Sequence, residues 1–463
     1  MHQKAVLSLT WAKSGEKCAK VQTSGKNKIW RPNFLLQRGD LMSFGKIAVD
    51  WEERINLDRM RRERVERAKM AFKKQGLEAA LLLHSDNVRY VGGGDGVHMW
   101  HGVSGYRYVL FFAEKGETVL YEAGMRKNYM EQALPWCKVD YAIPIMPYLA
   151  DNTPEGVYQR QLEKFANQIK ASLKEQGLSK EVLGIDTNSP AVISALKKVG
   201  IETSLKCSKA MVEARKIKTK DEVECLRMAA SIAEAIFSEF KKVIRPGVTE
   251  MQLRAIATYT AYMAGADWAS APDINSGPHT SQGIAIQCSD RAIRPGDLIA
   301  AALCNISYNG YKTCYYRTFS CGKPTEAQKD AYKKALDLLY NAINAIKPGA
   351  TTKDIAEKWP KAQDMGLAKR SNEDAAVLMQ WGHGIGLGLY ETPVISRIWS
   401  LDFPERLEPG MTLALETLWP TEEKSYEYPY GQAVRIEEML HVTETGVEVL
   451  SKWPVDEITV CEI

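Results

Sequence analysis

The chain has 463 residues, of which 45% are hydrophobic and 25% charged, a composition typical of folded globular domains. Its length is sufficient for two or three domains with cores of their own. The formal charge of +4 without a conspicuous Lys/Arg run argues against nucleic-acid binding. No apolar run approaches the ~20 residues that span a bilayer. Nine cysteines without CxxC spacing indicate reduced thiols in a cytoplasmic protein.

Residues 1–55 are mixed and basic, and we interpret them as an N-terminal extension. The first residues, MHQKAVLSLTWAKSG, lack a convincing cleavage site and a full hydrophobic core. This pattern favours a loosely ordered tail or an upstream start codon over a signal peptide.

Residues 56–210 alternate between helical and strand patterns. NLDRMRRERVERAKMAFKKQGLEAALLL, from Asn56, predicts a charged amphipathic helix, a Gly turn and a buried strand. Further strands are expected within 106–114, 117–124 and 182–187, and a helix within 156–177. This alternation predicts an α/β domain.

Residues 211–455 form the second predicted domain, which opens with a long helix. Asp221 is expected as its N-terminal cap or first-turn acid, and Pro246-Gly247 as its stop. Another helix, β-rich segments, further helices and terminal strands follow.

A repeated sequence pattern divides this second domain into two similar halves. RPGDLIAAALC (294–304) and EPGMTLALETL (408–418) share a Pro-Gly turn before an apolar strand, and the preceding helices end in IRPGVT and IKPGAT. This pattern predicts a duplicated helix-plus-strands unit. Counted from each Pro-Gly, Ala302 occupies the place of Glu416.

GDLIAAALCNISYNGYKTCYYRTF (296–319) predicts a β-hairpin that offers Ala302, Cys304 and Cys314 but no carboxylate. Later in the chain, WGHGIGLGLYETP surrounds His383 with alternating glycines, which let the backbone approach a ligand or another strand. This histidine could be a ligand, an acid/base group or a hydrogen-bonded core residue.

Glu416 lies inside the apolar strand LALETLW, where a carboxylate is costly to bury unless it is paired, protonated or metal-bound. In AVRIEEML, Glu437 and Arg435 are two residues apart and would share one face of a strand. The alternative is an exposed edge strand with outward charges, above all for Glu438. In DINSGPHTSQ, His279 lies in a turn that suits a catalytic imidazole, although surface turns carry histidine as often.

These motifs resemble those of the creatinase/aminopeptidase P superfamily, the pita-bread peptidase M24 group. The segments GHGIG, YETP, EPGMTLALE, RIEE and RTF occur in the right order over residues 58–455, and the full chain is especially similar to dimethylsulfoniopropionate-lyase-like members. The resemblance implies a smaller N-terminal creatinase-type α/β domain, a duplicated pita-bread α/β catalytic domain, and a homodimer.

In metallopeptidases of this superfamily, two metal ions lie between two hairpin Asp residues, one His and two Glu. The His and Glu positions fall on His383, Glu416 and Glu437, whereas the Asp positions fall on Ala302 (or Cys304) and Cys314. We therefore expect no dinuclear centre and no cofactor. The alternative is one divalent ion (Zn, Fe or Mn) bound by members of the set Cys304, Cys314, His383, Glu416 and Glu437.

Creatinase and ectoine hydrolase are metal-free members that cleave C–N bonds in small nitrogen compounds. The creatinase histidine of an INTDGAH-like loop falls on His279, and a cysteine near Cys314 resembles the ectoine hydrolase pattern. The creatinase Glu before Arg-Thr is replaced by Tyr316, and Tyr390 stands where the lyases are expected to carry an Asp base.

The leading hypothesis is therefore a hydrolase of a C–N bond in a small cationic nitrogen compound. His279 would activate water, His383 and Glu416 would orient the substrate and stabilise the tetrahedral intermediate, and Glu437 with Arg435 would set the charge. Substrate contacts are expected from Trp100, Arg107, Tyr316, Glu391 and Arg435.

A cationic substrate is expected because carboxylates without a metal would repel one another. Aromatic residues in or beside the motifs could add an onium cage, or could simply pack as hydrophobic walls: Trp100, Trp268, Trp381, Trp419, Tyr308, Tyr315 and Tyr316. The alternatives are a metal-dependent Xaa-Pro-type peptidase or dimethylsulfoniopropionate-type lyase, and a non-catalytic pita-bread binding protein. No nucleic-acid or membrane partner is expected.

Overall fold

The computed structural model describes residues 55–92, 105–270, 272–281, 287–347, 349–361, 364, 381–422, 424 and 431–463. They belong to one compact unit, Arg54–Ile463. The predicted extension up to residue 54 and the predicted substrate contact Trp100 lie outside the described residues. Among the described helices, none is both long and apolar enough to traverse a bilayer.

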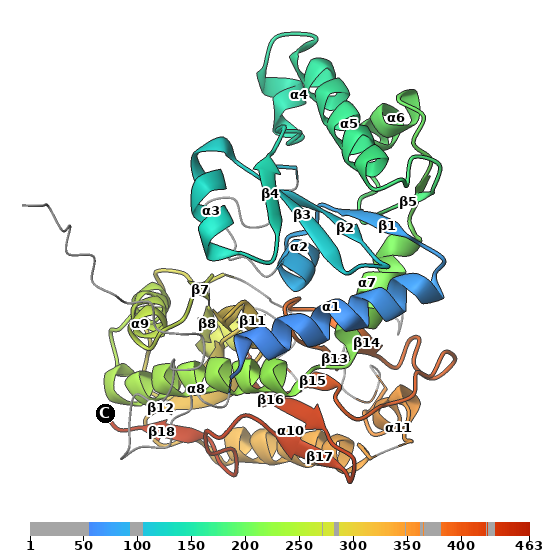
Figure 1. Ribbon diagram of the computed structural model, residues 1–463. Helices are drawn as coiled ribbons and strands as arrows, with labels where there is room; N and C mark the ends of the chain where they lie inside the picture. Colours follow the sequence, from blue (N-terminus) through green and yellow to red (C-terminus); the bar gives the residue numbers. More distant parts are fainter. Residues whose placement is uncertain are drawn as a thin grey trace, which may run out of the picture. The chain divides into compact units, whose positions relative to one another are not determined.

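The N-terminal part is a six-stranded mixed sheet in the order β4-β3-β2-β1-β5-β6. Its strands are β1 (Ala79–Leu82), β2 (Tyr108–Phe112), β3 (Glu117–Glu122), β4 (Lys138–Tyr141), β5 (Leu183–Ile185) and β6 (Thr203–Ser204). Its helices are α1 (Leu57–Lys74), α2 (Ser85–Gly92), η3 (Gly124–Arg126), α3 (Lys127–Ala133), α4 (Tyr148–Asn152), α5 (Val157–Glu175), α6 (Pro190–Lys198) and α7 (Lys206–Lys216). The predicted helices and strands are confirmed (Figure 1).

Helices cover both faces of this sheet, which explains why its central strands β1 and β2 are buried along their whole length. Phe111 of β2 packs with Phe72 of α1 in one core, whereas Leu110 packs with Phe165 of α5 in another. Successive residues of a strand point to opposite faces, so a strand between two helix layers needs apolar residues at every position.

The C-terminal part contains three sheets, ordered β18-β12-β9-β8, β14-β13-β15-β16-β17 and β11-β10-β7. Their strands are β7 (Trp268–Ala269), β8 (Asp273–Ser276), β9 (Leu298–Ala302), β10 (Ile306–Tyr308), β11 (Tyr311–Lys312), β12 (Tyr316–Cys321), β13 (Gly382–Gly384), β14 (Glu391–Ile395), β15 (Thr412–Pro420), β16 (Ala433–Val442), β17 (Val447–Val449) and β18 (Thr459–Cys461). The helices are α8 (Lys220–Val243), α9 (Glu250–Met263), η4 (Gly277–Thr280), α10 (Glu326–Asn344) and α11 (Thr352–Ala356).

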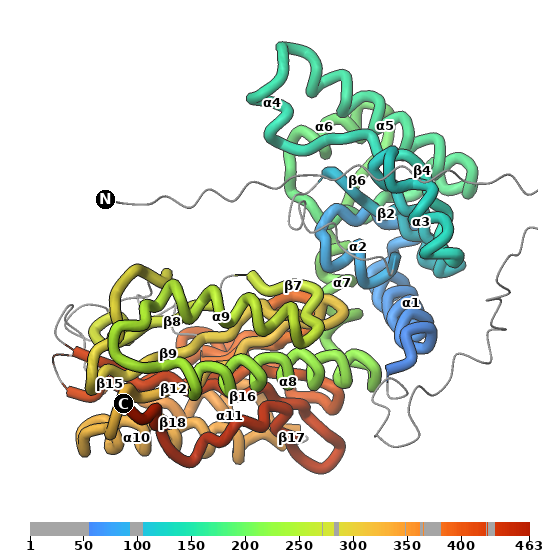
Figure 2. Tube along the Cα trace, turned by 90° about the vertical axis from the view of Figure 1, so that its left-hand side faces the viewer, coloured from blue at the N-terminus to red at the C-terminus, as the bar shows by residue number. Residues whose placement is uncertain are grey.

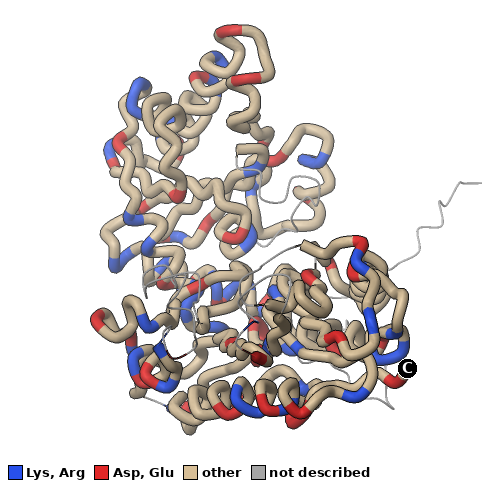
Figure 3. The backbone as a smooth tube through the Cα atoms, turned by 180° about the vertical axis from the view of Figure 1, so that it is seen from behind, with Lys and Arg blue, Asp and Glu red and all other residues tan. Residues whose placement is uncertain are grey.

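Helices lie on both sides of these strands. Phe237 and Phe240 of α8 pack with Phe319 of β12, and Leu339 of α10 packs with Leu415 of β15. In both views, α9 lies above β12 and β16, and α10 lies below them (Figures 1 and 2). Short acidic and basic segments alternate along the described chain, so the small net charge is not collected in one stretch (Figure 3).

The start of α8 is fixed by local hydrogen bonds. Thr219 caps the helix in a reciprocal capping box with Glu222. Asp221 is the buried first-turn acid that the sequence predicts, and its carboxylate accepts two hydrogen bonds from Arg59 at 2.7 and 2.8 Å. The helix ends at Val243, three residues before Pro246-Gly247.

The predicted duplication is visible in equivalent backbone contacts of the two halves. Isolated bridges join Thr249 to Ala292 and Thr351 to Arg406. The amides of Gly296 and Gly410 donate 2.8 Å hydrogen bonds to Cys321 and Val442. Both glycines have positive φ, +83° and +89°, which favours glycine in each turn. The two turns start β9 and β15 alike, so Ala302 and Glu416 hold equivalent positions.

The segment 296–319 is more elaborate than the predicted simple hairpin. β9 and β12 pair antiparallel with Tyr316 opposite Ala302. The residues between them form a second hairpin, β10–β11, which joins β7 in a separate sheet.

A buried arginine fastens β12 to β16. The Arg317 guanidinium donates to both carboxylate oxygens of Glu438 at 2.8 and 3.0 Å and to the Glu437 carbonyl at 2.8 Å. Both side chains of the Arg317–Glu438 pair are 1% exposed. The outward-facing alternative for Glu438 is therefore wrong.

Glu391 binds cations of the protein itself, because Lys218 lies 2.7 Å and Arg215 3.3 Å from its carboxylate. The Gly388 amide donates to the same group at 2.9 Å. A Cβ at Gly386 would lie 2.7 Å from a Glu391 oxygen, so the glycine run makes room for this ion cluster. The expected substrate-binding role of Glu391 does not fit a carboxylate already held by two cations.

Replacing Glu438 should destabilise the fold. In Glu438→Gln, the buried Arg317 charge loses its partner, and we expect the free energy of unfolding to fall by about 3–5 kcal/mol in chemical denaturation. Glu326→Gln is the matched control, because Glu326 pairs with Lys329 on an exposed helix surface and should matter little. Equal stabilities of the two variants would contradict this reading of the Arg317–Glu438 pair.

The Glu391 cluster should make stability depend on acid. Burial acts to raise the pKa of Glu391, but Lys218 and Arg215 outweigh it and lower the pKa below the usual 4.5. Ionised Glu391 thus stabilises the folded chain above pH 4.5, and this contribution disappears as the pH falls through the lowered pKa. The free energies of unfolding of the wild type and Glu391→Gln should converge in acid. A gap that is constant or widens on acidification would disprove this.

Candidate active site

The face of the second sheet that points away from α10 carries the acidic residues. Glu416 on β15 lies directly opposite Glu437 on β16, and His383 on β13 lies opposite Ala414. The alternate residues Leu413 and Leu415 belong to the core under α10. The two-residue period therefore puts His383, Glu416, Glu437 and Arg435 on one face, as predicted for Glu437 and Arg435.

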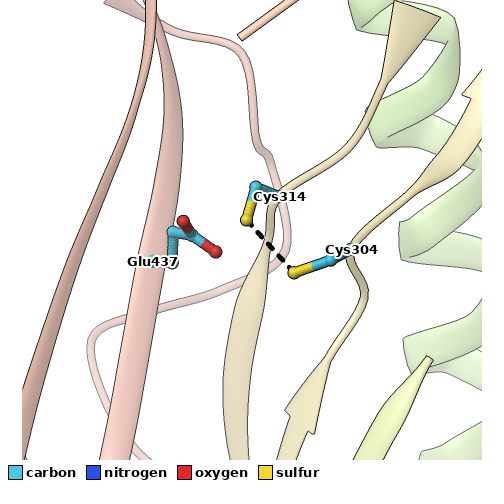
Figure 4. A group of neighbouring side chains, drawn as sticks. All are labelled: Cys304, Cys314 and Glu437. Atoms are coloured by element: carbon cyan, nitrogen blue, oxygen red, sulfur yellow. Dashed lines mark hydrogen bonds between the residues drawn. The ribbon is translucent and has the colours of Figure 1, made fainter. Parts of the chain in front are cut away.

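Two cysteines face this sheet from the first half. Backbone hydrogen bonds from Leu303 to Tyr315 and from Asn305 to Thr313 continue the pairing of β9 with β12 and place Cys304 opposite Cys314. Their Sγ atoms are 3.1 Å apart. Figure 4 shows both thiols extending toward Glu437.

This cysteine pairing depends on a bulge. Thr313 bonds to both Asn305 and Ile306, so two residues of one strand oppose one residue of the other. Asn305 has a positive φ of +62° at this point. Without the extra residue, the register of β10 with β11 would set Tyr315, not Cys314, opposite Cys304.

Glu437 is completely buried, and neither of its carboxylate oxygens has a hydrogen-bond partner among the described residues. Burial raises the pKa of Glu437 well above its usual value, and the nearby Glu416 and Cys304 add to the rise. The Cys314 thiol lies close and opposes this rise, but it does not reach hydrogen-bond geometry with either oxygen.

Glu416 is partly exposed, unlike Glu437. Burial raises the pKa of Glu416 to about 7, against the opposing charge of Arg435. The Arg435 backbone is fixed to β12, because Thr318 Oγ1 accepts from its amide at 3.0 Å and donates to its carbonyl at 2.7 Å. β15 and β16 thus hold a carboxyl and a guanidinium on one face.

His383 is buried, and its Nδ1 donates a hydrogen bond to the Gly384 carbonyl at 2.9 Å. In the neutral ring, Nε2 therefore carries the free lone pair and can accept a hydrogen bond. Burial lowers the pKa of His383 to about 4, which keeps the ring neutral at pH 7. The ring packs on Tyr390 with centroids 4.5 Å apart. Tyr390 is 58% exposed and forms the rim of this face.

Tyr316 lies on the opposite wall, where its hydroxyl accepts from the Cys304 thiol at 3.6 Å. Burial raises the pKa of Tyr316 well above its usual value, with further contributions from Cys304 and Glu416. Its hydroxyl is therefore protonated at pH 7 and can donate a hydrogen bond.

His279 lies elsewhere on the first sheet. Its Nδ1 is 3.0 Å from the Glu250 carboxylate, which is also held by Ser276 and Ser289. η4 lies beside Ala433, four residues from Glu437 along β16, or about 13 Å at the rise of a strand. The expected role of His279 in activating water stays a prediction, and Glu250 is the group that would orient its imidazole ring.

Other expected contacts are also engaged outside this face. Arg107 forms an ion pair with the buried Glu122 in the N-terminal sheet. Trp381 stacks on Trp359 with centroids 5.5 Å apart in the core under α10. Trp419 binds Lys334 of α10, and Tyr315 contacts Phe237 in the core under α8. Trp381, Trp419 and Tyr315 therefore do not contribute to the expected onium cage.

Sequence reasoning missed the partners that decide these placements. Glu250 follows Thr249 in an ordinary helix start, and Lys218 lies in a basic linker, so neither carries a local signal. The sequence links the rim residue Tyr390 to chemistry only through the lyase resemblance, in which it stands where an Asp base is expected.

The described residues do not fit a dinuclear metal centre. Two divalent ions need several carboxylate oxygens, and the hairpin supplies Ala302, Cys304 and Cys314 instead. The carboxylates of Glu416 and Glu437 are present, so half of a carboxylate ligand set remains.

Comparisons with known proteins agree with this architecture. The metallopeptidase family M24 matches residues 224–444, and the creatinase/prolidase N-terminal domain matches residues 64–217. An Xaa-Pro dipeptidase of Pyrococcus furiosus is 30% identical over 278 residues, which are 59% of this chain and 74% of that protein. A dimethylsulfoniopropionate lyase of Roseobacter denitrificans is 23% identical over 412 residues, 87% of each chain.

Among solved structures, an Xaa-Pro dipeptidase from Bacillus anthracis is similar with a TM-score of 0.64 at 24% identity, covering 86% of this chain and 99% of that chain. This likeness confirms the predicted fold, a creatinase-type α/β domain followed by a pita-bread catalytic domain. The chain belongs to the metallopeptidase family M24 and is a hydrolase of that family.

Proposed function

We propose that this protein hydrolyses a C–N bond in a small nitrogen compound without a dinuclear metal centre. The supporting observation is that Glu416 and Glu437 face each other beside His383, whereas the hairpin opposite them has no carboxylate. A site with half of the carboxylates can still transfer protons, but it cannot hold two divalent ions in the family's manner.

Glu416 is the carboxyl that a substrate can reach, because it is partly exposed and Glu437 is completely buried. In the proposed reaction, ionised Glu416 takes a proton from water while the water oxygen attacks the carbon of the C–N bond. The same carboxyl then returns the proton to the nitrogen as the C–N bond breaks. An amide would give a carboxylic acid and an amine.

Tyr316 and His383 flank this path from opposite walls. The Tyr316 hydroxyl would donate a hydrogen bond to the oxyanion that forms during the attack. Neutral His383 would present Nε2 to the substrate, its ring orientation fixed by Gly384 and Tyr390. Arg435, whose charge acts on Glu416, would bind an anionic group of the substrate.

Because Trp381, Trp419 and Tyr315 are engaged elsewhere, preference for a cationic substrate would depend mainly on the carboxylates. We retain guanidino, betaine and ectoine-like compounds as the first substrate class on that ground. Xaa-Pro dipeptides are the second class, favoured by the Xaa-Pro dipeptidase relatives. The lyase relative adds dimethylsulfoniopropionate as a sulfonium compound to test.

Glu416→Gln should abolish most turnover. Once a substrate from these classes is found, we expect kcat to fall by ~10²–10⁴-fold with a smaller change in KM, because Gln cannot carry the proton. Glu416→Asp should recover part of kcat. The matched control is Glu408→Gln in the turn before β15, where Glu408 pairs with Lys216.

Two outcomes would refute the proposal. One is full activity of Glu416→Gln combined with loss of activity in His279→Ala, which would return the acid/base role to His279. The other is the absence of turnover on all three substrate classes by folded protein, which would favour a binding protein.

A further inference from the structure

We propose that Cys304, Cys314 and Glu437 bind one thiophilic divalent cation, with zinc as the favoured ion. The inference concerns the face of the proposed function, but its test requires no turnover. Each proposal can therefore fail alone.

The three ligand atoms already converge. One ligand atom from each of Cys304, Cys314 and Glu437 lies within 4.8 Å of the others. Cys304 follows β9, Cys314 precedes β12, and Glu437 lies in the middle of β16 (Figure 4). The side chains come from both halves of the domain, so the whole fold, not a flexible loop, sets their positions.

The environment of Glu437 independently indicates that a ligand binds here. Its side chain is fully buried, and both oxygens lack a hydrogen-bond partner among the described residues. A buried carboxylate without partners is strongly disfavoured unless it is protonated or neutralised by a cation. An ion bound between Glu437 and the two sulfurs would give one or both of the Glu437 carboxylate oxygens a direct partner.

The sulfur separation is compatible with an ion after a small movement. Zn–S bonds of about 2.3 Å at the tetrahedral angle place two sulfurs about 3.8 Å apart. The observed 3.1 Å is shorter than this and far longer than the ~2.04 Å of a disulfide. Cys304 is partly exposed, so its side chain can rotate to open the pair.

The ligand types select the ion. Thiolates favour zinc and other soft or borderline ions, whereas Mg²⁺ and Mn²⁺ prefer oxygen ligands. Three protein ligands leave the fourth tetrahedral position open, as in catalytic zinc sites. The Tyr316 hydroxyl contacts Cys304 and Glu416 lies opposite Glu437, so both would be near a water or substrate bound to the ion.

The test uses the full-length protein, reduced and freed of metal with a chelator. Zinc is titrated against a chromophoric chelator, and cobalt is added in parallel as a spectroscopic probe. We expect one equivalent of zinc to bind, and cobalt to give a near-ultraviolet sulfur-to-metal charge-transfer band.

Cys304→Ser and Cys314→Ser should weaken zinc binding by more than the ~10–100-fold that loss of an outer-shell partner costs. Each should also reduce the cobalt band. Glu437→Gln should keep the band and lose affinity. Cys207→Ser, in α7, is the matched control and should bind zinc like the wild type.

Circular dichroism of each variant excludes misfolding, and the partly exposed Cys304 provides the variant with the least risk to the core. The proposal is overturned if reduced wild-type protein does not bind zinc, or if the cysteine variants bind it unchanged. Tight Mn²⁺ binding without a sulfur band would equally overturn it.

Discussion

The candidate site depends on the hydrogen bonds of one buried guanidinium. Arg317 leaves β12 and binds the Glu438 carboxylate, the Glu437 carbonyl and the Trp453 carbonyl. It thereby fixes the strand that follows Cys314 against the strand that carries Glu437. The distance between thiols and carboxylate is consequently a property of the joint between the two halves. Glu438, whose side chain points to the opposite face from that of Glu437, supplies the negative charge that neutralises the buried Arg317 guanidinium.

The duplicated fold also clarifies how the two halves contribute different chemical groups to the site. Equivalent Pro-Gly turns start β9 and β15, and they deliver Ala302 and Glu416 to matching positions. The backbone therefore imposes a symmetry that the side chains do not follow. Negative charge is concentrated on the second half, and the first half offers sulfur and a phenol. Any chemistry at this face must combine a proton-transferring carboxyl with partners of low charge.

The sequence predicts what depends on strand period and on motif order. His383, Glu416, Glu437 and Arg435 share a face because β15 and β16 keep strict alternation, and the helix and strand limits of the N-terminal domain follow from local patterns. His279, Glu391 and Arg107 each have a protein partner that the sequence did not predict. Each binds a charged residue that is distant in sequence or carries no local signal: Glu250, Lys218 and Glu122. A polar motif indicates that its side chains need an oppositely charged or hydrogen-bonding partner. It does not indicate whether the substrate or the protein supplies that partner.

The two-residue period of the strands is not sufficient to predict that Cys304 and Cys314 lie opposite each other. A regular hairpin continued from β10 and β11 would pair Cys304 with Tyr315, and only the bulge at Asn305 shifts the register by one residue. A one-residue shift turns a side chain to the opposite face of a strand. The asparagine with positive φ is therefore as necessary to the cluster as the thiols are. Because a local backbone feature sets the distance between two sulfurs, a change at Asn305 would alter the site without touching a chemically active group.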